Sequence, residues 1–535
     1  MTSPSQHLTS PLAGEAGTRG EPGEGGAPQT PASAGATLLP NPSPAGGEGL
    51  ESNAIRFVLD GEMVEVADVA PTTTVLEWLR EHRQRSGTKE GCAEGDCGAC
   101  TVVLGELDAN GDMRYRAINS CIRFLPTIDG KELVTVESLA DGDKLHPVQQ
   151  AMVDRHASQC GFCTPGFVMS LFALYLQQPT ASREEVVEAL AGNLCRCTGY
   201  RPIIDAGCAI GAYPDPSLWS REQAQNPSHR RALRSLQRDR ALELPGFVAP
   251  RCLDELARAV QAHPDALLLA GGTDIGLWVT KHLREPARII YIGEVRELQN
   301  VETRGDGTLR IGAAVTLTDA WHAIVARVPE LAELAQRFAS PPVRNSGTLV
   351  GNIANGSPIG DAMPALIALD ATIELRIGNA TRTLPLEAFY LDYMKKDLAR
   401  GEFVVAVNLP MPNATTRVAS YKLSKRIDQD ISAVCAAFAV EVVDRRIVAA
   451  RIACGGMAAI PARAKRAEAA LTGQPFDEAA FAAAAKALAE DFKPLSDMRA
   501  SAAYRLQGAQ NLLRRFHLEH AAHQVLRTHD AEVSA

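Results

Sequence analysis

The sequence lacks the features that mark membrane-spanning, secreted or nucleic-acid-binding proteins. No run approaches the roughly 18 uninterrupted apolar residues that a membrane-spanning helix needs. The chain does not open with the cationic segment and apolar core of a secretory signal. Its 54 lysines and arginines are outnumbered by 63 aspartates and glutamates, and the net charge of −9 argues against a general nucleic-acid binder. We therefore expect a cytoplasmic protein with no membrane and no nucleic-acid partner.

Aromatic residues are also scarce. They make up 5% of the 535 residues, so leucine, valine, isoleucine and alanine must fill most of the interior. The chain is nevertheless 46% apolar and 22% charged, which is ordinary for a globular protein that buries hydrophobic cores. With roughly 100–200 residues per domain as a prior, this length predicts several domains.

The twelve cysteines are unevenly distributed, because eight of them lie in tight pairs and triplets between Cys92 and Cys197. Disulfides are rare in a reducing cytosol, so clustered cysteines there indicate metal or redox chemistry. The other four are scattered, and we expect them to be small buried hydrophobic residues. They are Cys208, Cys252, Cys435 and Cys454.

The first part of the chain predicts a tail followed by two small domains. Residues 1–53 are rich in Gly, Pro, Ser, Ala and Thr, and we expect them to be disordered. Short apolar strands around the hairpin signal Asp60-Gly61, a capping box at Thr74 and a strand from Thr101 predict an α+β domain over 54–135. Helical patterns, with a second capping box at Ser182, predict a helical bundle over 136–212.

The second part predicts a linker and two larger domains. Residues 213–243 contain several arginines and predict either a solvated tether or a strap across a partner surface. Short buried strands then alternate with helices over 244–414, with a glycine- and serine-rich stretch at 340–361. A final α+β domain is predicted over 415–525, ending in an alanine-rich helix around 481–488, before a tail at 526–535.

The first cysteine group reads Cys92-x4-Cys97-x2-Cys100, with Cys121 beyond an intervening strand. This is the plant-type ferredoxin spacing for a [2Fe–2S] cluster. Glycines in the loop allow the positive φ and the close backbone approach that a loop curled around a cluster requires. Structural zinc sites usually have two CxxC-like pairs, so a triplet with a distant single cysteine favours the cluster.

The second cysteine group consists of two pairs, Cys160-x2-Cys163 and Cys195-x-Cys197. Two pairs alone also suit zinc, although Cys195-x-Cys197 is tighter than the usual zinc spacing. We expect each pair at a helix terminus, where free N–H groups can face the negative charge of a cluster. Two cluster sites in one chain would form a redox wire.

Both groups together, in this order, resemble the iron–sulfur region of the xanthine oxidase/dehydrogenase family of molybdenum hydroxylases. The resemblance rests on the cysteine groups and their surroundings, Gln159-Cys160-Gly161-Phe162-Cys163-Thr164-Pro165-Gly166 and Gly192-Asn193-Leu194-Cys195-Arg196-Cys197-Thr198-Gly199-Tyr200-Arg201-Pro202. It covers residues 54–212 and continues through flavin motifs to roughly 525. It implies an α+β multidomain fold with a β-grasp ferredoxin-like domain, a helical [2Fe–2S] bundle domain, a vanillyl-alcohol-oxidase-like FAD-binding domain and a C-terminal α+β domain.

The same resemblance implies roles for individual residues. The helical-domain cluster would lie next to a molybdopterin cofactor and the ferredoxin-like cluster nearer FAD. Gln159 would contact the pterin, with a helix-capping glutamine as the alternative. The implied cluster ligands are Cys92, Cys97, Cys100 and Cys121 for one cluster, and Cys160, Cys163, Cys195 and Cys197 for the other.

Two further segments predict the flavin site. Residues 268–276 run from a predicted strand into a helix, and their glycines free N–H groups for a pyrophosphate, although the pattern is not G-x-G-x-x-G. Residues 346–361 offer small side chains and hydroxyls where a bulky anionic cofactor must approach the backbone. Both are similar to the FAD-binding domain of the family, where two such loops clamp the flavin. The implied cofactor contacts are Leu269, Ala270, Gly271, Gly272, Thr273, Asp274, Ile275, Phe338, Ser346, Gly347, Gly351, Asn352, Ser357, Asp361 and Lys422.

The resemblance implies a relay rather than a catalytic acid or base in this chain. A molybdenum partner subunit would oxidise hypoxanthine and xanthine towards urate, and electrons would pass through both clusters to FAD and then NAD+. Tyr393 falls where relatives place an aromatic residue at the nicotinamide pocket, and Lys422 lies at the same flavin/NAD pocket. Residues 424–430, which match the loop that tunes access for NAD+ versus oxygen, contain no thiol, so no redox switch is predicted there. The partner is expected in a heterotetramer, a dimer of heterodimers.

Three alternatives remain open. The chain could serve an aldehyde or carbon monoxide dehydrogenase of the same superfamily, although these commonly keep the iron–sulfur and FAD parts on separate chains. It could be a stand-alone NADH-dependent reductase. A zinc-scaffolded interaction module is the non-enzymatic alternative, and it would be colourless.

Overall fold

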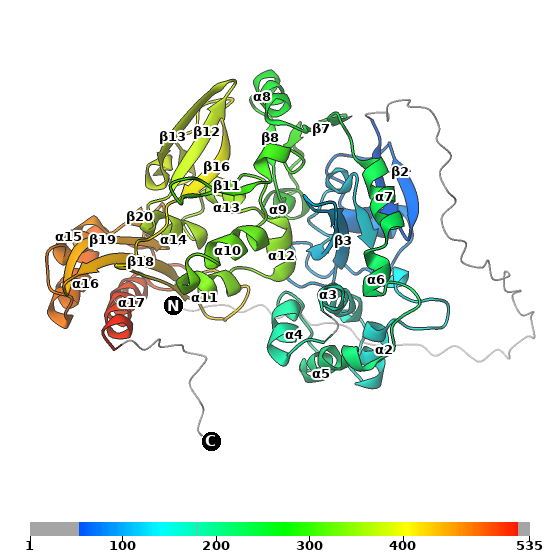
Figure 1. Cartoon of the computed structure of the whole chain (residues 1–535), viewed down its shortest axis with the longest axis horizontal. Helices are drawn as coiled ribbons and strands as arrows, with labels where there is room; N and C mark the ends of the chain where they lie inside the picture. Colours follow the sequence, from blue (N-terminus) through cyan, green and yellow to red (C-terminus); the bar gives the residue numbers. More distant parts are fainter. Residues whose placement is uncertain (1–52, 179, 523–535) are drawn as a thin grey trace, which may run out of the picture. The chain divides into compact units, whose positions relative to one another are not determined.

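The computed structural model describes residues 53–178 and 180–522 (Figure 1). The tails expected over 1–53 and 526–535 lie outside these residues, except for Asn53. Within them the architecture is α+β and multidomain, as predicted. None of the described helices is long and apolar enough to cross a membrane.

The first domain is a mixed five-stranded sheet in the order β2-β1-β5-β3-β4. Asp60 and Gly61 both have positive φ, 54° and 77°, and make the predicted hairpin turn. The capping box at Thr74 starts the helical segment that crosses the sheet, as predicted. The parallel β1–β5 pair beside antiparallel neighbours gives the β-grasp arrangement. The elements are β1 (Ile55–Leu59), β2 (Glu62–Val66), α1 (Val75–Glu77), β3 (Thr101–Leu107), β4 (Met113–Asn119) and β5 (Glu132–Val134).

The second domain is a helical bundle that packs on this sheet. Its central helix α3 is buried from Gly166 to Tyr175, because almost every residue there is apolar. Phe167 and Phe172 of this helix share one core with Val103 of β3. The Ser182 capping box starts α4, as predicted. The helices are α2 (Pro147–Asp154), α3 (Thr164–Gln177), α4 (Arg183–Leu190) and α5 (Arg201–Ala209).

The segment expected as a linker, 213–243, packs against the first two domains rather than running through solvent. It forms α6 (Arg221–Ala224) and α7 (Pro227–Leu236), and Leu233 and Leu236 join the core of the helical domain and β3. Arg238 then pairs with Asp129 of the first domain, Nε–Oδ2 2.6 Å. The arginines that suggested a tether are therefore partly structural.

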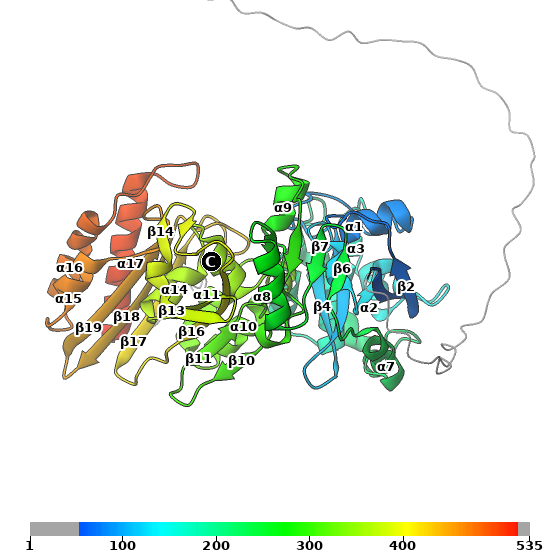
Figure 2. The same ribbon diagram turned by 90° about the horizontal axis from the view of Figure 1, so that it is seen from above.

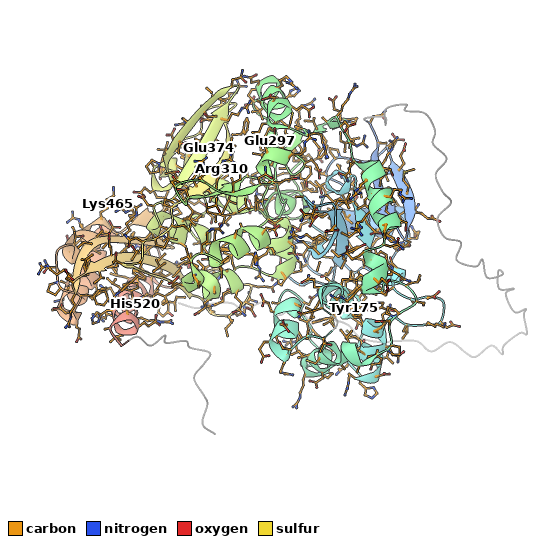
Figure 3. The ribbon with its side chains drawn as sticks, viewed as in Figure 1. Tyr175, Glu297, Arg310, Glu374, Lys465 and His520 are labelled. Atoms are coloured by element: carbon orange, nitrogen blue, oxygen red, sulfur yellow. The ribbon has the colours of Figure 1, made fainter. Side chains whose placement is uncertain are left out.

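The flavin half begins with a four-stranded sheet in the order β6-β7-β9-β8, followed by a five-stranded antiparallel sheet in the order β10-β11-β16-β12-β13. Arg310 of β11 and Glu374 of β12 reach across β16 and pair, Nε–Oε2 3.1 Å (Figure 3). The strands are β6 (Leu242–Leu244), β7 (Phe247–Ala249), β8 (Leu267–Leu269), β9 (Ile289–Tyr291), β10 (Val301–Thr303), β11 (Leu309–Gly312), β12 (Thr372–Ile377), β13 (Ala380–Pro385) and β16 (Phe403–Leu409). The helices nearest the predicted flavin segments are α9 (Ile275–Thr280), α10 (Leu317–Val325), α12 (Pro341–Ser346), α13 (Leu349–Asn355) and α14 (Ala362–Ala368).

The C-terminal domain is an antiparallel sheet with helices along one face (Figure 2). Phe438 of the sheet packs with Phe481 and Phe516 of the helices. The prediction that the domain ends in the alanine-rich helix α16 is wrong. A further helix, α17, follows it and buries Leu513 and Phe516. The elements are β17 (Thr416–Leu423), β18 (Val434–Val443), β19 (Arg446–Gly455), β20 (Ala462–Arg463), α15 (Lys465–Leu471), α16 (Glu478–Asp491) and α17 (Ala502–Ala522).

Candidate functional site

The structure brings the four cysteines of the first group together in the loop before β3 and at the end of β4. The sulfurs of Cys100 and Cys121 lie 3.2 Å apart, and both residues are buried. The Cys92 thiol interacts with the thiols of Cys121 and Cys97, and its pKa is lowered by these two contacts. The main-chain N–H of Cys97 also donates to Cys92 Sγ at 3.4 Å.

The loop geometry fits a sulfur-ligated cluster. A Cβ at Gly91 would lie 2.8 Å from Cys97 Sγ, so no side chain fits there. Gly95 and Gly98 have φ of 79° and 69°, which lets the loop curl with its thiols inward. Four soft thiolates with a main-chain N–H aimed at one of them make a donor set suited to iron–sulfur chemistry.

The second group forms two pairs, Cys160 with Cys197 and Cys163 with Cys195, whose thiols interact so that the pKa of Cys160 is lowered, whereas burial and the Cys195 thiol raise the pKa of Cys163. Cys163 is the N-cap of α3, in accord with the expected helix terminus. The N–H and hydroxyl of Thr198 donate to Cys195 Sγ at 3.4 and 3.1 Å. Within 53–178 and 180–522 no set of three or more His, Cys, Asp or Glu side chains has the geometry to hold a metal ion, so both groups are identified from pairwise sulfur contacts.

The second group lies at the surface. Cys160 and Cys197 are exposed, whereas Cys195 is buried. Apolar side chains beside them are also exposed: Phe162 at 48%, Leu194 at 43% and Tyr200 at 37%. Gln159 is exposed next to Cys160, and no hydrogen bond of its side chain is found among the described residues, so it caps no described helix. Exposed cysteines with exposed apolar side chains beside them form a surface suited to a protein partner.

The first cysteine group also contacts the predicted flavin loop. Ile122, the residue after Cys121, fills the space in front of α9, because a Cβ at Gly276 would lie 2.8 Å from its Cβ. The hydroxyl of Thr280 on α9 donates to the main-chain oxygen of Ala93 at 2.7 Å. The cysteine loop is therefore in direct contact with the end of α9, and Ile122 with its first turn.

The structure brings most of the predicted flavin residues to adjoining loops. Ala270 to Asp274 follow β8, where Gly272 has a φ of 76°. Gly347 approaches Thr273, because a Cβ at Gly347 would lie 3.1 Å from Thr273 Oγ1. The Oδ1 of Asn352 on α13 is buried without a hydrogen-bond partner among the described residues. An unsatisfied acceptor and side-chain-free backbone fit a hydrogen-bonding cofactor at this place.

A buried ion pair joins two more predicted residues. Lys422 Nζ lies 2.8 Å from Asp361 Oδ2, and their side chains are 3% and 9% exposed. Lys422 also donates to the main-chain oxygen of Arg337, next to Phe338, and Ser432 donates to Asp361 Oδ1 at 2.6 Å. The paired charges are thus fixed in a low-dielectric region beside α14.

Two further sets of predicted positions lie outside these loops. Tyr393 is 62% exposed between β14 (Tyr390–Asp392) and β15 (Lys395–Lys396), and no ring contact of its side chain is found among the described residues. The prediction that four scattered cysteines are buried is wrong for Cys208, which is exposed, and only partly met by Cys252. Cys208 lies on the outer side of α5, a short helix that buries one face only.

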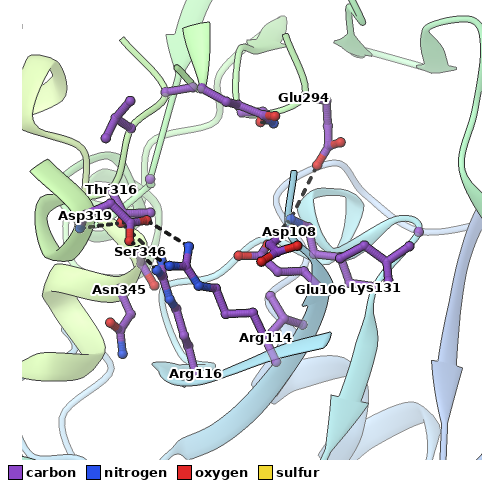
Figure 4. A pocket seen from close by; sticks show the side chains of 18 of the residues that line it. Glu106, Asp108, Arg114, Arg116, Lys131, Glu294, Thr316, Asp319, Asn345 and Ser346 are labelled. Carbon is purple, nitrogen blue, oxygen red and sulfur yellow. Dashed lines mark hydrogen bonds and ion pairs between the residues drawn. The ribbon is translucent and has the colours of Figure 1, made fainter. Parts of the chain in front are cut away.

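A charged cavity of about 760 Å³ lies between the first domain and the flavin half (Figure 4). Asp319 of α10 pairs with Arg116 of β4 at 2.6 Å and with Arg114 at 3.3 Å. On the opposite wall, Lys131 pairs with Glu106 and Glu294 at 2.8 and 3.4 Å. Of the predicted flavin contacts, this cavity is lined by Ala270, Gly271 and Ser346. The sequence did not indicate the Arg116–Asp319 pair, because its members lie in separate domains.

Comparisons with known families agree with this layout. Residues 57–124 match the family described as 2Fe-2S iron-sulfur cluster binding domain, and 135–208 match the [2Fe-2S] binding domain family. Residues 240–412 match the FAD binding domain in molybdopterin dehydrogenase, and 419–520 match the CO dehydrogenase flavoprotein C-terminal domain.

Individual relatives cover the same stretch. Xanthine dehydrogenase of Emericella nidulans is 33% identical over 500 residues, which are 82% of this chain and 36% of the relative. Xanthine dehydrogenase of Drosophila pseudoobscura pseudoobscura is 32% identical over 491 residues, 80% of this chain and 36% of the relative. The chain belongs to the xanthine oxidase family. It carries two [2Fe–2S]-binding domains and an FAD-binding domain of that family, and it spans about a third of the length of these relatives.

Among solved structures of molybdenum hydroxylases, carbon monoxide dehydrogenase from Hydrogenophaga pseudoflava is 32% identical to this chain. The match covers 50% of this chain and 94% of that one, with a TM-score of 0.48.

Proposed function

We propose that this chain is the electron-transfer subunit of a xanthine dehydrogenase, which oxidises hypoxanthine and xanthine towards urate with NAD+ as the acceptor. The observation that supports this most directly is that the three sites lie next to one another in a row. The second cysteine group adjoins the first, and Ile122 beside Cys121 adjoins the flavin loop at Gly276. Bound clusters supply one-electron transfer, and bound FAD supplies a two-electron store for hydride transfer to NAD+.

The residues of this chain hold and orient these groups. We propose domain boundaries at 54–135, 136–212, 244–414 and 415–525. The first cluster would be held by Cys92, Cys97, Cys100 and Cys121, and the second by Cys160, Cys163, Cys195 and Cys197. FAD would be held by the two loops at 269–275 and 346–361, with Phe338 and Lys422, and Tyr393 would serve the nicotinamide side.

The fixed charges near the flavin loops have a defined task. Lys422 and Asp361 form a buried ion pair, so both side chains are held in place beside the flavin loops. Gly271 and Gly272 carry no side chain that would block an anion from their main-chain N–H groups. These groups bind and orient the anionic parts of the cofactor, and no side chain of this chain needs to act as a general acid or base.

The exposed second cysteine group is proposed as the docking face for a molybdopterin-containing subunit. Phe162, Leu194 and Tyr200 supply exposed apolar area around Cys160 and Cys197. Gln159 stands at the same face, where it can contact a pterin. We propose a cytoplasmic dimer of such heterodimers.

An aldehyde or carbon monoxide dehydrogenase role is the second candidate, supported by the match of 419–520 to a CO dehydrogenase flavoprotein domain. The xanthine dehydrogenase role is favoured because a single alignment to each relative of that name covers about 80% of this chain, and so includes both the iron–sulfur and the flavin parts. A stand-alone NADH-dependent reductase would need no molybdenum partner.

The deciding experiment is anaerobic purification of the chain with whatever subunit accompanies it, followed by metal and flavin analysis. Two [2Fe–2S] clusters and one FAD predict four iron atoms and one flavin per chain, with molybdenum from the partner. Hypoxanthine and xanthine should reduce NAD+, whereas aldehydes and carbon monoxide should not. Zinc in place of iron, or a colourless preparation, would refute the proposal.

A further inference from the structure

The two cysteine groups are joined by a hydrogen bond between their own loops. The main-chain N–H of Leu194, the residue before Cys195, donates to the main-chain oxygen of Cys97 at 3.0 Å. The acceptor oxygen belongs to Cys97 itself, and the donor Leu194 is directly followed by Cys195. The bond is thus the shortest connection between the groups that the described contacts provide.

Neighbouring backbone is packed too closely for side chains at this junction. A Cβ at Gly98 would lie 2.2 Å from the main-chain oxygen of Gly192, and a Cβ at Gly166 would lie 2.1 Å from the main-chain oxygen of Gly98. Gly98 and Gly192 have φ of 69° and 110°. The main-chain polar groups at this junction need hydrogen-bond partners within the protein, because little water can reach them.

The Asn193 side chain supplies those hydrogen bonds. Its Nδ2 donates to the main-chain oxygen of Gly98 at 3.1 Å and to Thr101 Oγ1 at 3.3 Å. Its Oδ1 accepts from Ser170 Oγ of α3 at 2.6 Å, which fixes the orientation of the amide. Asn193 is 4% exposed, Ser170 2% and Thr101 1%. One side chain therefore ties the Cys97 loop, the Cys195 loop and α3 together.

We propose that Asn193 is a positioning residue for electron transfer between the two clusters, and this inference rests on the proposed function. It holds the Leu194 N–H against the Cys97 oxygen and so fixes the separation and relative orientation of the two ligand loops. With both clusters bound, one electron would leave the second cluster and one would enter the first, and no proton or co-reactant would be required. Among the described residues the hydrogen bonds of the Asn193 side chain go to Ser170, Gly98 and Thr101 rather than to a cysteine sulfur, so Asn193 acts through the loops that carry the cysteines.

The test replaces Asn193 in the full chain with its partner. Asn193→Asp keeps the size but replaces the amide donor with a carboxylate oxygen facing Gly98 and Thr101. Ser170→Ala keeps both donors and removes only the group that orients them. Asn511→Asp, on the exposed side of α17, makes the same chemical change far from both groups.

Three readouts are required: iron content, the spin–spin splitting between the two reduced clusters, and hydrogen exchange of the Leu194 N–H. In Asn193→Asp we expect both clusters to be retained, the splitting to change, Leu194 exchange to accelerate and inter-cluster transfer to slow about tenfold, the scale of supporting-residue effects at metal sites. Ser170→Ala should change the same quantities less, and Asn511→Asp should not change them.

Unchanged splitting and exchange in Asn193→Asp, with both clusters present, would overturn the inference and leave the proposed function intact. Loss of iron from one site in both Asn193→Asp and Ser170→Ala would also overturn it, because Asn193 would then support a ligand loop rather than set a separation. A wild-type chain without iron would instead refute the proposed function itself.

Discussion

Gly271 of the first flavin loop touches Ser346 of the second so closely that a Cβ at Gly271 would lie 1.9 Å from the main-chain oxygen of Ser346. These residues are far apart in the sequence and belong to β8–α9 and α12. Their contact shows that the two loops predicted to clamp the flavin form one surface. It also makes Gly271 the position where that surface is most sensitive to an added methyl group.

Gly271→Ala is therefore expected to destabilise the fold by about 1–3 kcal/mol, the usual cost of overpacking, and to lower FAD content. Thermal unfolding and released-flavin fluorescence measure the two effects. Gly305→Ala is the control, because a Cβ there meets nothing within 4 Å. Equal stability and flavin content in both variants would contradict the assigned contact.

Cys163→Ser should remove the second cluster, because its thiol pairs with Cys195 and burial raises the pKa of Cys163 to about 12, so that metal coordination is needed to keep it as a thiolate. Iron should fall by about half while FAD stays bound, and NAD+-linked turnover should be lost. Cys208→Ser, at an exposed position outside both groups, should change neither iron nor turnover. NAD+-linked turnover that survives Cys163→Ser would disprove the assignment.

Lys422→Met leaves Asp361 as a buried carboxylate whose remaining hydrogen-bond donor, the Ser432 hydroxyl, is neutral. We expect a loss of about 3–5 kcal/mol in unfolding free energy, together with weaker FAD binding. Denaturant unfolding and flavin titration measure the two quantities. Lys425→Met removes an exposed lysine from the same segment and should change both only slightly. If adding Asp361→Asn to Lys422→Met restored no stability, the loss could not be ascribed to the unpaired charge.

His146 should make the helical domain sensitive to acid. Its Nδ1 caps α2, its ring packs edge-on against Phe172 and Tyr175, and burial lowers its pKa from 6.5 to about 4. The folded state stays neutral in this window while the unfolded state binds a proton, so stability should fall by about 3 kcal/mol as the pH drops from about 6.5 to about 4.

His146→Asn keeps a capping acceptor without a titrating group. Urea unfolding at several pH values should show that the acid-induced loss of stability is smaller in this variant by about the same amount. Parallel pH profiles for the two proteins would rule out His146 as the source.

Much of this protein was determined by short stretches of sequence. The cysteine spacings, the capping boxes at Thr74 and Ser182 and the Asp60-Gly61 hairpin all specify structure within a few residues, where propensity and hydrogen bonding act locally. The family resemblance rests on the same short segments. Each of these features could therefore be predicted before any tertiary contact was known.

Only the tertiary structure decided how these segments meet. The Cys97–Leu194 hydrogen bond, the Gly271–Ser346 contact and the Arg116–Asp319 pair each join residues from separate elements, and no periodicity or spacing connects them. The packing of the segment 213–243 and the helix α17 were not predicted, for a related reason. Each has a mostly polar sequence and buries only one narrow face, the first against the core of the helical domain and the second against the core of the C-terminal domain. Long-range packing decides which of many compatible surfaces come together, and this packing depends on the whole chain rather than on any one segment.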